Sequence, residues 1–479
     1  MKSSNYIAGQ WVDGKGLIKN INPSDTADII AEYTSSTSEQ FEQAVQSAIS
    51  AQKEWQKVGI EKKSQILIKI GDELILKSKE IGEQLSREEG KPLAEGIGEV
   101  ARAGQQFQYY GSECLRLYGE KIPSTRPGFQ VEVSREPLGV VGIISPWNFP
   151  IAIPAWKAAP ALMCGNAVIL KPASLTAGSA IALTEIISNQ DIPNGLFNLV
   201  LGSGSDIGNK IATHPDIAAI TFTGSVEIGK KLYHDSSPTL KKMQMEMGSK
   251  NPLVVMDDAD LQTAITCAAN GAFGGTGQKC TASSRLIVHE NIYKEFVEGL
   301  IENIKNLKVG HALDEGTQMG PTSNHNQYES NLNYVEIGKD EAKLAFGGNP
   351  MNMRTPGYYM EPTLFVDGDN KSRINQEEMF GPIACVIPTK NLEDALEIAN
   401  DTEFGLSSGI ITKSLAKSEY FKQNIKTGVC TINLPTAGLD YHVPFGGRKA
   451  SSFGPREQGT YAKDFYSQVK TSYINSGSI

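Results

Sequence analysis

The amino-acid sequence predicts an α/β protein made of two α/β domains in succession. The chain has 479 residues, which is more than one hydrophobic core usually supports. From residue 138 onward, short apolar runs alternate with helical patterns, as is typical of strand–helix–strand units around a buried parallel sheet. The alternation starts again near residue 252, and we therefore expect a second sheet in the later half of the chain.

Residues 39–118 precede the first of these strands and have the apolar periodicity of helices. Ser38, followed by Phe41 and Glu42, resembles a helix start. Two sets of apolar residues at helical spacing predict buried helix faces, namely Phe41, Val45, Ala48 and Ile49 in one and Ile66, Ile70, Leu74 and Ile75 in the other.

The expected strands fall into two series. The first comprises the apolar runs 139–144, 167–170, 197–200 and 219–222, with a helix expected over 179–187. The second comprises 253–256, 286–288 and 384–387. The tail from Ala462 to Tyr473 alternates polar and apolar residues like an exposed strand. We expect it to pair either with residues 131–133 or with another subunit.

The composition excludes several classes of protein. A net charge of -9 argues against a nucleic-acid-binding protein and against a protein of anionic membranes. The first residues lack the apolar core of a signal peptide, and no apolar run reaches the length of a membrane span. We therefore expect a cytoplasmic protein. The six cysteines are scattered and have no partners at metal-ligand spacing. We therefore expect neither a disulfide scaffold nor a metal site.

One cysteine differs from the other five in its surroundings. Cys280 follows Gly275-Thr276-Gly277 and precedes Thr281-Ala282-Ser283-Ser284, a backbone that favours close approach of a ligand over packing. Glu246 lies on another segment of small residues, Met247-Gly248-Ser249. A thiol that attacks a carbonyl and a carboxylate that takes a proton are the two groups that covalent aldehyde oxidation needs.

Four segments that follow expected strands predict a dinucleotide site. They are Ser145–Pro150, Lys171–Ser174, Gly202–Gly208 and Phe222–Gly229. Open α/β sheets bind ligands at the carboxyl ends of their strands, and the amides of helix N-termini favour phosphate. Neither glycine-rich turn has the G-x-G-x-x-G spacing. It is their order along one sheet that favours a nucleotide site over simple turns.

These motifs together identify the chain as a member of the aldehyde dehydrogenase superfamily. The matching segments run in family order: Pro146-Trp147-Asn148-Phe149-Pro150, Trp156-Lys157, Phe222-Thr223-Gly224-Ser225, Glu246–Lys250, Gly277–Cys280, Glu378–Pro382 and Pro444–Lys449. The resemblance implies two Rossmann-like α/β domains and a small β oligomerisation flap. The NAD(P)-binding domain would comprise 1–118 and 138–246, the catalytic domain 247–445, and the flap 119–137 and 460–479. It also implies a homodimer or homotetramer.

The resemblance assigns a role to each matching residue. Cys280 would be the nucleophile, Asn148 the donor that stabilises the oxyanion together with the Cys280 backbone amide, and Glu246 the base that activates water. Glu378 would hold the nicotinamide ribose and Lys171 the adenosine ribose. The remaining cofactor contacts would be Ser145, Pro146, Trp147, Ser174, Gly204, Gly208, Phe222, Thr223, Gly224, Ser225, Ile228, Gly229, Met247 and Phe380.

Two positions depart from the family pattern. Ser249 replaces the second glycine of the motif that carries the base, and we expect a residue this small to be harmless. Ser174 stands where relatives that prefer NAD commonly have a glutamate. A carboxylate would repel a 2'-phosphate, whereas Ser174 beside Lys171 could bind one. We therefore predict that NADP is used and NAD tolerated; whether NADP is preferred stays open.

The segments 435–449 and 281–285 most resemble those of α-ketoglutaric semialdehyde (2,5-dioxopentanoate) dehydrogenases, which form 2-oxoglutarate at the end of bacterial sugar-acid breakdown. Succinate semialdehyde dehydrogenases are the nearest alternative, followed by an aldehyde dehydrogenase of broader specificity. Both semialdehydes carry a carboxylate, which requires a cation or several donors. We expect six residues in the substrate pocket, namely Arg102, Phe149, Trp156, Thr281, Leu439 and Phe445. Arg102 stands where relatives contribute an apolar residue to the substrate funnel, and we nominate it as a carboxylate clamp because of its charge.

Three other functions compete with this one. A CoA-acylating dehydrogenase would share the cysteine, but relatives of that kind lack a carboxylate at the position of Glu246. A non-catalytic protein would not need Cys280, Asn148, Glu246 and Glu378 together. A cysteine hydrolase would place a histidine beside the thiol, and none of the six histidines lies in such a motif.

Overall fold

The four apolar runs between residues 139 and 222 form neighbouring strands of one sheet in the computed structural model, which describes residues 4–475 and 477. These strands pair in parallel and are buried, as their apolar composition predicts. The eight-stranded sheet has the order β19-β11-β10-β7-β8-β9-β1-β2. Its strands are β1 (Asn5–Ile7), β2 (Gln10–Val12), β7 (Val140–Ile144), β8 (Ala167–Lys171), β9 (Phe197–Leu199), β10 (Ile217–Thr223), β11 (Lys242–Glu246) and β19 (Ser452–Phe453).

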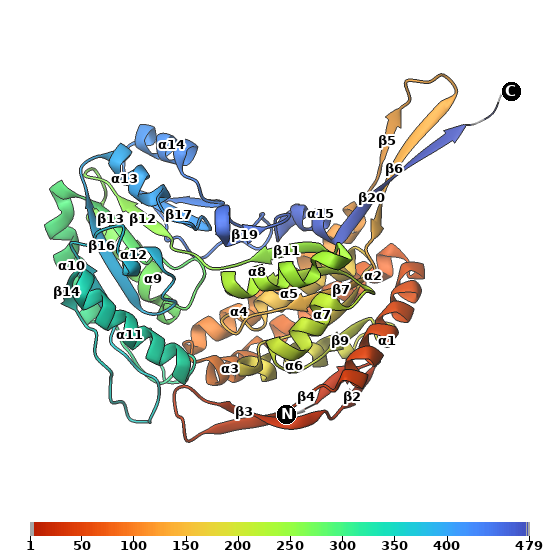
Figure 1. Ribbon diagram of the computed structural model, residues 1–479, viewed down its shortest axis with the longest axis horizontal. Coiled ribbons are helices and arrows are strands. Elements are labelled where there is room, and N and C mark those ends of the chain that lie inside the picture. Colours follow the sequence, from red (N-terminus) through yellow and green to blue (C-terminus); the bar gives the residue numbers. More distant parts are fainter. Residues whose placement is uncertain (1–3, 476, 478–479) are drawn as a thin grey trace.

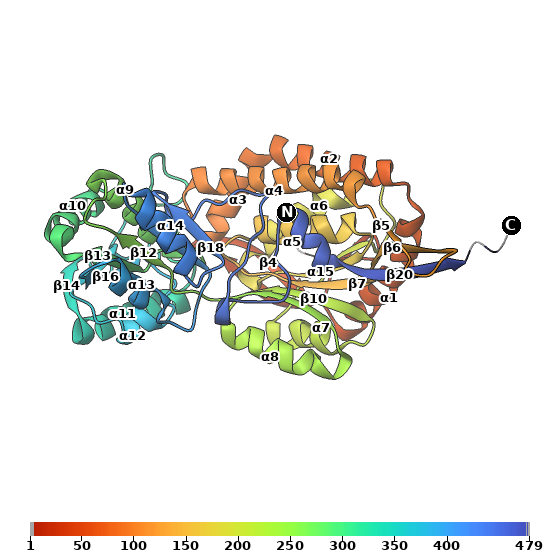
Figure 2. The ribbon, with the colours of Figure 1, turned by 90° about the horizontal axis from the view of Figure 1, so that it is seen from above.

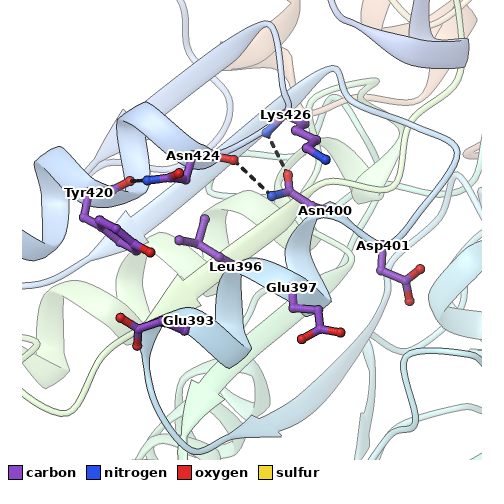
Figure 3. Close-up of a pocket in the computed structure, with 8 residues that line it drawn as sticks. All are labelled: Glu393, Leu396, Glu397, Asn400, Asp401, Tyr420, Asn424 and Lys426. Carbon is purple, nitrogen blue, oxygen red and sulfur yellow. Dashed lines mark hydrogen bonds between the residues drawn. The ribbon is translucent and has the colours of Figure 1, made fainter.

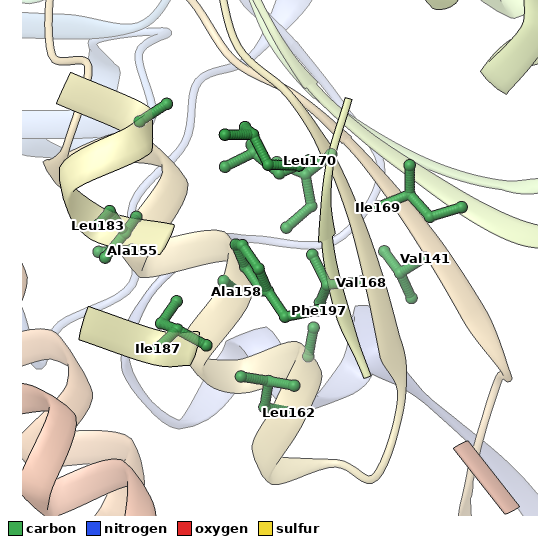
Figure 4. Packing of buried hydrophobic residues seen from close by; sticks show 14 of the residues in the cluster. Val141, Ala155, Ala158, Leu162, Val168, Ile169, Leu170, Leu183, Ile187 and Phe197 are labelled. Carbon is green, nitrogen blue, oxygen red and sulfur yellow. The ribbon is translucent and has the colours of Figure 1, made fainter. Parts of the chain in front are cut away.

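Helices cover both faces of this sheet (Figures 1 and 2). Figure 4 shows one of the packed layers, in which Ala158, Leu162 and Ile187 lie against Val168 and Phe197, all of them buried. The helices of this lobe are α1 (Ser38–Lys57), α2 (Ile60–Leu76), α3 (Ser78–Glu89), α4 (Leu93–Glu113), α5 (Ala152–Met163), α6 (Ala177–Ser188), α7 (Asn209–Thr213) and α8 (Val226–Ser236). The helix predicted over 179–187 is thus confirmed as part of α6.

One detail of the predicted helical region is confirmed and one needs correction. α1 begins at Ser38, as predicted, and Thr37 caps it, because its hydroxyl accepts the Gln40 amide and the Gln40 side chain accepts the Thr37 amide in return. Ile75 does not belong to the buried face of α2, since its side chain is 37% exposed at the edge of the contact with α4.

The second predicted series of strands forms a separate seven-stranded sheet with the order β14-β15-β16-β13-β12-β17-β18. Only β14 runs antiparallel to its neighbour. The strands are β12 (Pro252–Val255), β13 (Arg285–His289), β14 (Lys343–Phe346), β15 (Thr363–Val366), β16 (Ile383–Thr389), β17 (Ser407–Ile411) and β18 (Val429–Ile432). Its helices are α9 (Leu261–Phe273), α10 (Tyr293–Lys305), α11 (His325–Glu341), α12 (Arg373–Gln376), α13 (Leu392–Asn400) and α14 (Leu415–Asn424).

A three-stranded antiparallel sheet projects from the first lobe as a narrow arm (Figure 1). We call it the flap; it consists of β5 (Glu120–Pro123), β6 (Phe129–Pro137) and β20 (Ser467–Asn475). The predicted pairing of the tail with residues 131–133 is confirmed within one chain, since Thr471 lies opposite Val133 and Tyr473 opposite Val131. The tail differs from the prediction at its beginning, because residues 463–466 form a short helix, α15 (Lys463–Tyr466).

Two further features complete the description. A two-stranded sheet of β3 (Lys15–Ile21) and β4 (Ile29–Ser35) lies beside the first lobe. Residues 1–3, 476 and 478–479 lie outside the described residues. They belong to the ends of the predicted segments 1–118 and 460–479. Within the described part of the chain, no helix is both long and apolar enough to cross a bilayer.

The segment after β11 connects the two lobes. β11 ends at Glu246 in the first sheet, and β12 begins at Pro252 in the second, so that residues 247–251 cross between them. β10 ends beside β11 at Thr223, and β7 ends beside β10 at Ile144. The fold therefore brings the carboxyl ends of three parallel strands to the junction between the lobes, where open α/β sheets bind ligands.

Candidate active site

Cys280 follows a tight loop with an unusual backbone. The turn Gly274–Gly277 contains Gly275 and Thr276 in the left-handed region, both at φ +59°. A β-branched residue rarely adopts this conformation, and such strain persists where the surroundings fix it. Here the Thr276 hydroxyl donates to the Gly320 carbonyl at 3.1 Å. Gly277 leaves no room for a side chain, since a Cβ would lie 2.2 Å from the Gly381 carbonyl oxygen.

The carbonyl of Cys280 is held from the crossing segment 247–251. Asn251 Nδ2 donates to this oxygen at 2.8 Å, and the Ser249 hydroxyl donates to it as well. Ser249, expected from the sequence only to be small enough, therefore helps to anchor the cysteine. The same residue uses its backbone amide to bind the Glu378 carboxylate at 2.8 Å.

Asn148 and Cys280 line one cavity of about 280 Å³. The Asn148 side chain is buried, and its Nδ2 donates to the Gln278 carbonyl oxygen at 3.1 Å. An amide nitrogen carries two hydrogens, so that one remains for a ligand at the thiol. Met247, Glu378 and Phe380 line the same cavity. The Asn148 amide, a hydrogen-bond donor, and the Cys280 thiol therefore face the same cavity.

The Cys280 thiol holds its proton strongly. Burial raises the pKa of this thiol to about 12, and the nearby carboxylates of Glu246 and Glu378 act in the same direction. Since the thiolate is the nucleophile, attack on a carbonyl requires a group that removes the proton.

Glu246, the last residue of β11, is buried and faces away from that cavity. Gln244 Nε2 donates to Glu246 Oε1 at 3.1 Å, and the Ser452 hydroxyl donates to Oε2. Glu246 is not among the residues that line the cavity at the thiol. Burial, followed by the negative charge of Glu457, raises the pKa of the Glu246 carboxyl well above its usual range. In this position the carboxyl favours its protonated form.

The sequence patterns indicated no role for Lys157 and Glu457, two charged residues near Glu246. Lys157 Nζ donates to Thr221 Oγ1 at 2.7 Å and forms an ion pair with Glu457. All three side chains are buried or nearly so. A buried lysine is stable only when it is paired and hydrogen-bonded, as here. The one local signal was the Trp156-Lys157 pair, a lysine in an otherwise apolar helix.

A second cavity of about 440 Å³ extends from the thiol cavity toward Lys171. The two share five lining residues, Pro146, Trp147, Thr223, Gly224 and Ser225. Ser225 caps the N-terminus of α8, and its hydroxyl accepts the Ile228 amide. A helix N-terminus with free amides at a cavity favours phosphate.

The groups in this cavity fit a dinucleotide. The hydroxyls of Ser145 and Thr223 are buried and have no hydrogen-bond partner among the described residues. Lys171 Nζ donates only to the neighbouring Pro172 carbonyl at 2.9 Å, and burial lowers the pKa of this amine to about 8. Phe222, Gly204 and Ile228 complete the predicted lining. Glu378 lies at the thiol end, where burial raises the pKa of its carboxyl to about 7.

Three predicted cofactor contacts lie outside this lining. The Ser174 hydroxyl donates to the Gly202 carbonyl at 3.3 Å. Gly208 ends the π-helical turn Gly204–Gly208 that leads into α7. Gly229 serves packing, because a Cβ there would lie 2.4 Å from the Met247 sulfur. Met247 itself lines the thiol cavity, so that Gly229 acts on the site only through this contact.

A third cavity of about 440 Å³ reaches the thiol from the opposite side. All six predicted substrate residues line it: Arg102, Phe149, Trp156, Thr281, Leu439 and Phe445. Trp156 and Phe445 form an aromatic wall, with ring centroids 5.8 Å apart. Cys280 therefore lines two separate cavities, one that adjoins the cavity at Lys171 and one with an aromatic wall.

Of the charged residues that line this third cavity, Arg102 has no carboxylate partner among the described residues. Glu95 pairs with Lys279 at 3.1 Å, and Glu99 pairs with Lys91 at 2.7 Å. The Arg102 guanidinium stacks over the Tyr441 ring at 5.6 Å and forms no ion pair with any described residue. An arginine in this situation is suited to bind a carboxylate.

A further hollow of about 420 Å³ lies between α13 and α14, away from the thiol (Figure 3). Its amides bind one another: Asn400 Nδ2 donates to the Asn424 carbonyl at 3.1 Å, and Lys426 donates its backbone amide to Asn400 Oδ1 at 2.7 Å. None of the predicted site residues lines it. It therefore has no part in the site at Cys280.

Comparison with known proteins agrees with this geometry. The model of the aldehyde dehydrogenase family matches residues 11–472. An α-ketoglutaric semialdehyde dehydrogenase of Bacillus subtilis is 42% identical over 98% of this chain and 97% of its own length. A mitochondrial succinate-semialdehyde dehydrogenase of Arabidopsis thaliana is 35% identical over 98% and 89%. The crystal structure of a Staphylococcus aureus betaine aldehyde dehydrogenase in complex with NAD+ superposes with a TM-score of 0.97 at 30% identity, covering 100% and 96%.

The raised pKa of Cys280 predicts the pH dependence of its alkylation. Below a pKa of about 12 the thiolate fraction grows with pH, so the rate of reaction with iodoacetamide should rise about tenfold per pH unit from pH 7 to 9. Peptide mass spectrometry measures the rate at this residue, and Cys280→Ser corrects for the other cysteines. A plateau below pH 8 would contradict the prediction.

Proposed function

Because the chain belongs to the aldehyde dehydrogenase family and is therefore an NAD(P)-dependent aldehyde-oxidising enzyme, we propose that its substrate is a carboxylated semialdehyde. α-Ketoglutaric semialdehyde, which is oxidised to 2-oxoglutarate, is the substrate that we favour. The observation that carries this proposal is the position of Cys280 between the cavity that extends toward Lys171 and a cavity whose Arg102 forms no ion pair with any described residue.

The proposed reaction begins when an ionised Glu246 carboxylate takes the proton of the Cys280 thiol, and the sulfur attacks the aldehyde carbon. The second Asn148 hydrogen and the Cys280 backbone amide then stabilise the oxyanion of the thiohemiacetal. Removing a donor of this kind typically costs about 10²–10³ in turnover. A nicotinamide bound in the neighbouring cavity would supply the hydride acceptor, and loss of the hydride from the thiohemiacetal would leave a thioester on Cys280.

Glu246 would then activate the water that hydrolyses the thioester. The carboxyl is hydrogen-bonded to Ser452 on the far side from the thiol cavity, so this role requires it to rotate and to lose its proton. The presence of a carboxylate at this position supports hydrolysis over transfer of the acyl group to CoA.

For the cofactor we propose that NADP is used and NAD tolerated. Lys171 brings a buried amine to the far cavity, and no carboxylate occupies position 174 to repel a 2'-phosphate. Structures of similar enzymes contain NAD+, which supports tolerance of NAD. Glu378 and Lys171 would hold the two riboses, and the N-terminus of α8 the diphosphate.

The substrate proposal rests on charge and on similarity. Glu95 and Glu99 are paired with lysines, which leaves Arg102 to attract an anion into the third cavity. The most similar relative described above acts on α-ketoglutaric semialdehyde. Succinate semialdehyde, which carries the same terminal carboxylate, is the second candidate because of the Arabidopsis relative.

We assign residues 1–118 and 138–246 to cofactor binding, 247–445 to the catalytic domain, and 119–137 with 460–479 to oligomerisation. The flap supports the last assignment. β20 is a nine-residue edge strand, and its side chains Val469 and Tyr473 are 59% and 62% exposed. A long exposed edge with apolar side chains tends to pair with another chain. A homodimer or homotetramer would cover it.

A substrate panel tests the proposed function. Purified enzyme is assayed with α-ketoglutaric semialdehyde, succinate semialdehyde, betaine aldehyde and propanal, each with NADP and with NAD. We expect the highest kcat/KM for α-ketoglutaric semialdehyde, with NADP active and NAD less than about tenfold different, because neither cofactor meets a repelling carboxylate. A preference for neutral aldehydes would contradict the substrate proposal, and a strong NAD preference the cofactor proposal.

Replacement of Arg102 tests the carboxylate clamp. A hydrogen bond to a charged group contributes about 1.5–3 kcal/mol, so Arg102→Leu should raise the KM for carboxylated semialdehydes about ten- to hundredfold. The KM for propanal should stay within twofold. Arg116→Leu, which changes an exposed arginine outside the cavity, is the matched control. Equal effects on charged and neutral aldehydes would remove Arg102 from substrate binding.

The oligomer is tested at β20. Val469→Lys with Tyr473→Lys introduces charges at the exposed edge and should convert the assembly to smaller species in sedimentation velocity, because edge lysines oppose strand pairing. Leu76→Lys changes a side chain that is 83% exposed on α2 and should leave the assembly intact. Unfolding temperature and far-UV circular dichroism verify folding. A wild-type monomer at micromolar concentration would refute the assignment of the flap.

A further inference from the structure

A buried lysine outside the predicted site contacts the residue that faces the thiol. Lys91 lies between α3 and α4, and its side chain is 4% exposed. Its Nζ donates to the Asn148 carbonyl oxygen at 2.6 Å and to Glu99 Oε2 at 2.7 Å. The ammonium also lies over the Phe149 ring, 4.1 Å from its centroid.

Glu99, the partner of this lysine, holds the other end of the same loop. Glu99 Oε1 accepts the backbone amides of Ile151 at 2.9 Å and of Ala152 at 3.1 Å. These amides belong to the first turn of α5, which a carboxylate stabilises. One buried ion pair therefore fixes the backbone from residue 148 to residue 152 at both ends.

Lys91 makes two contacts that its ion pair with Glu99 does not require, one with the Asn148 carbonyl and one with the Phe149 ring. A buried ammonium needs a carboxylate and further acceptors, and any neighbouring carbonyl could provide them. Here the acceptor is the carbonyl of Asn148, whose side-chain amide lines the thiol cavity and donates to Gln278 at 3.1 Å. The cation–π contact fixes the next side chain, Phe149, which lines the cavity on the opposite side of the thiol.

We propose that Lys91 is a positioning residue that orients the Asn148 amide toward the oxyanion and the Phe149 ring toward the aldehyde chain. The proposal rests on the proposed function, because it requires Asn148 to act as the oxyanion donor. Lys91 touches neither substrate nor cofactor cavity and acts through the backbone carbonyl of residue 148 and the ring of residue 149. Displacements of about 1 Å in such a donor can cost about a hundredfold in rate.

A double-mutant cycle between Lys91 and Asn148 tests this proposal. Lys91→Met keeps the length of the side chain and removes its charge. We measure the burst of reduced cofactor with aldehyde, and the burst of nitrophenolate from 4-nitrophenyl acetate, which acylates the thiol without cofactor. Lys91→Met should slow both bursts about ten- to hundredfold, while the KM for NADP stays within twofold. In the Asn148→Ala background the same change should cost less than twofold.

Glu88→Gln is the matched control, since Glu88 is equally buried but binds the amides of Gly178 and Ser179 on another helix. It should lower the unfolding temperature without coupling to Asn148. If Lys91→Met does not fold, Glu99→Gln weakens the same clamp more gently and should show the same coupling. If the losses in burst rate of the two single variants multiply in the double variant, Lys91 and Asn148 act independently, and the positioning role of Lys91 is overturned while the proposed function stands. A full burst rate in Asn148→Ala would instead overturn the oxyanion role on which the proposed function depends.

Discussion

The contact between the crossing segment and the Cys280 carbonyl is the interaction on which the site depends. Ser249 and Asn251 belong to the short segment that crosses from the first sheet to the second. The side chains of both residues donate hydrogen bonds to the Cys280 carbonyl. Ser249 also binds Glu378. The thiol, Glu246 at the end of β11 and the Glu378 carboxylate are therefore placed by one short piece of backbone. A shift of one lobe against the other would displace all three.

Electrostatics explains why so many carboxylates can surround one thiol. Glu99 and Glu457 are each paired with a buried lysine, and Glu95 with a half-buried one. Glu246 and Glu378 lack such partners, and burial raises the pKa of both. The site thus contains carboxylates that are paired with lysines and two carboxyls whose pKa is raised by burial. Burial and pairing set this division, because a lone buried carboxylate is costly when ionised.

Local patterns in the sequence predicted the fold and many of the cavity residues, because strand periodicity and glycine-rich turns are written in neighbouring residues. The exposure of Ile75 differed from the prediction, since it depends on the packing of α2 against α4. The contacts of Lys91 and Lys157 could not be read from local patterns, because the Asn148 carbonyl and the Glu457 carboxylate lie 57 and 300 positions away from them. Ser174 and Gly229 stay predicted cofactor contacts; the structure shows a hydrogen bond from Ser174 to Gly202 and packing of Gly229 against Met247.

The order of the flap strands has a consequence for biosynthesis. β6 pairs along its full length with β20, and Arg135 binds Ser467 across 332 positions of sequence. During translation β6 therefore leaves the ribosome with one edge unpaired and stays so until almost the whole catalytic lobe has been made. An exposed strand edge during that interval invites mispairing with other nascent chains. The three-stranded flap can close only after the chain is complete, so its formation is a late, post-translational step of folding.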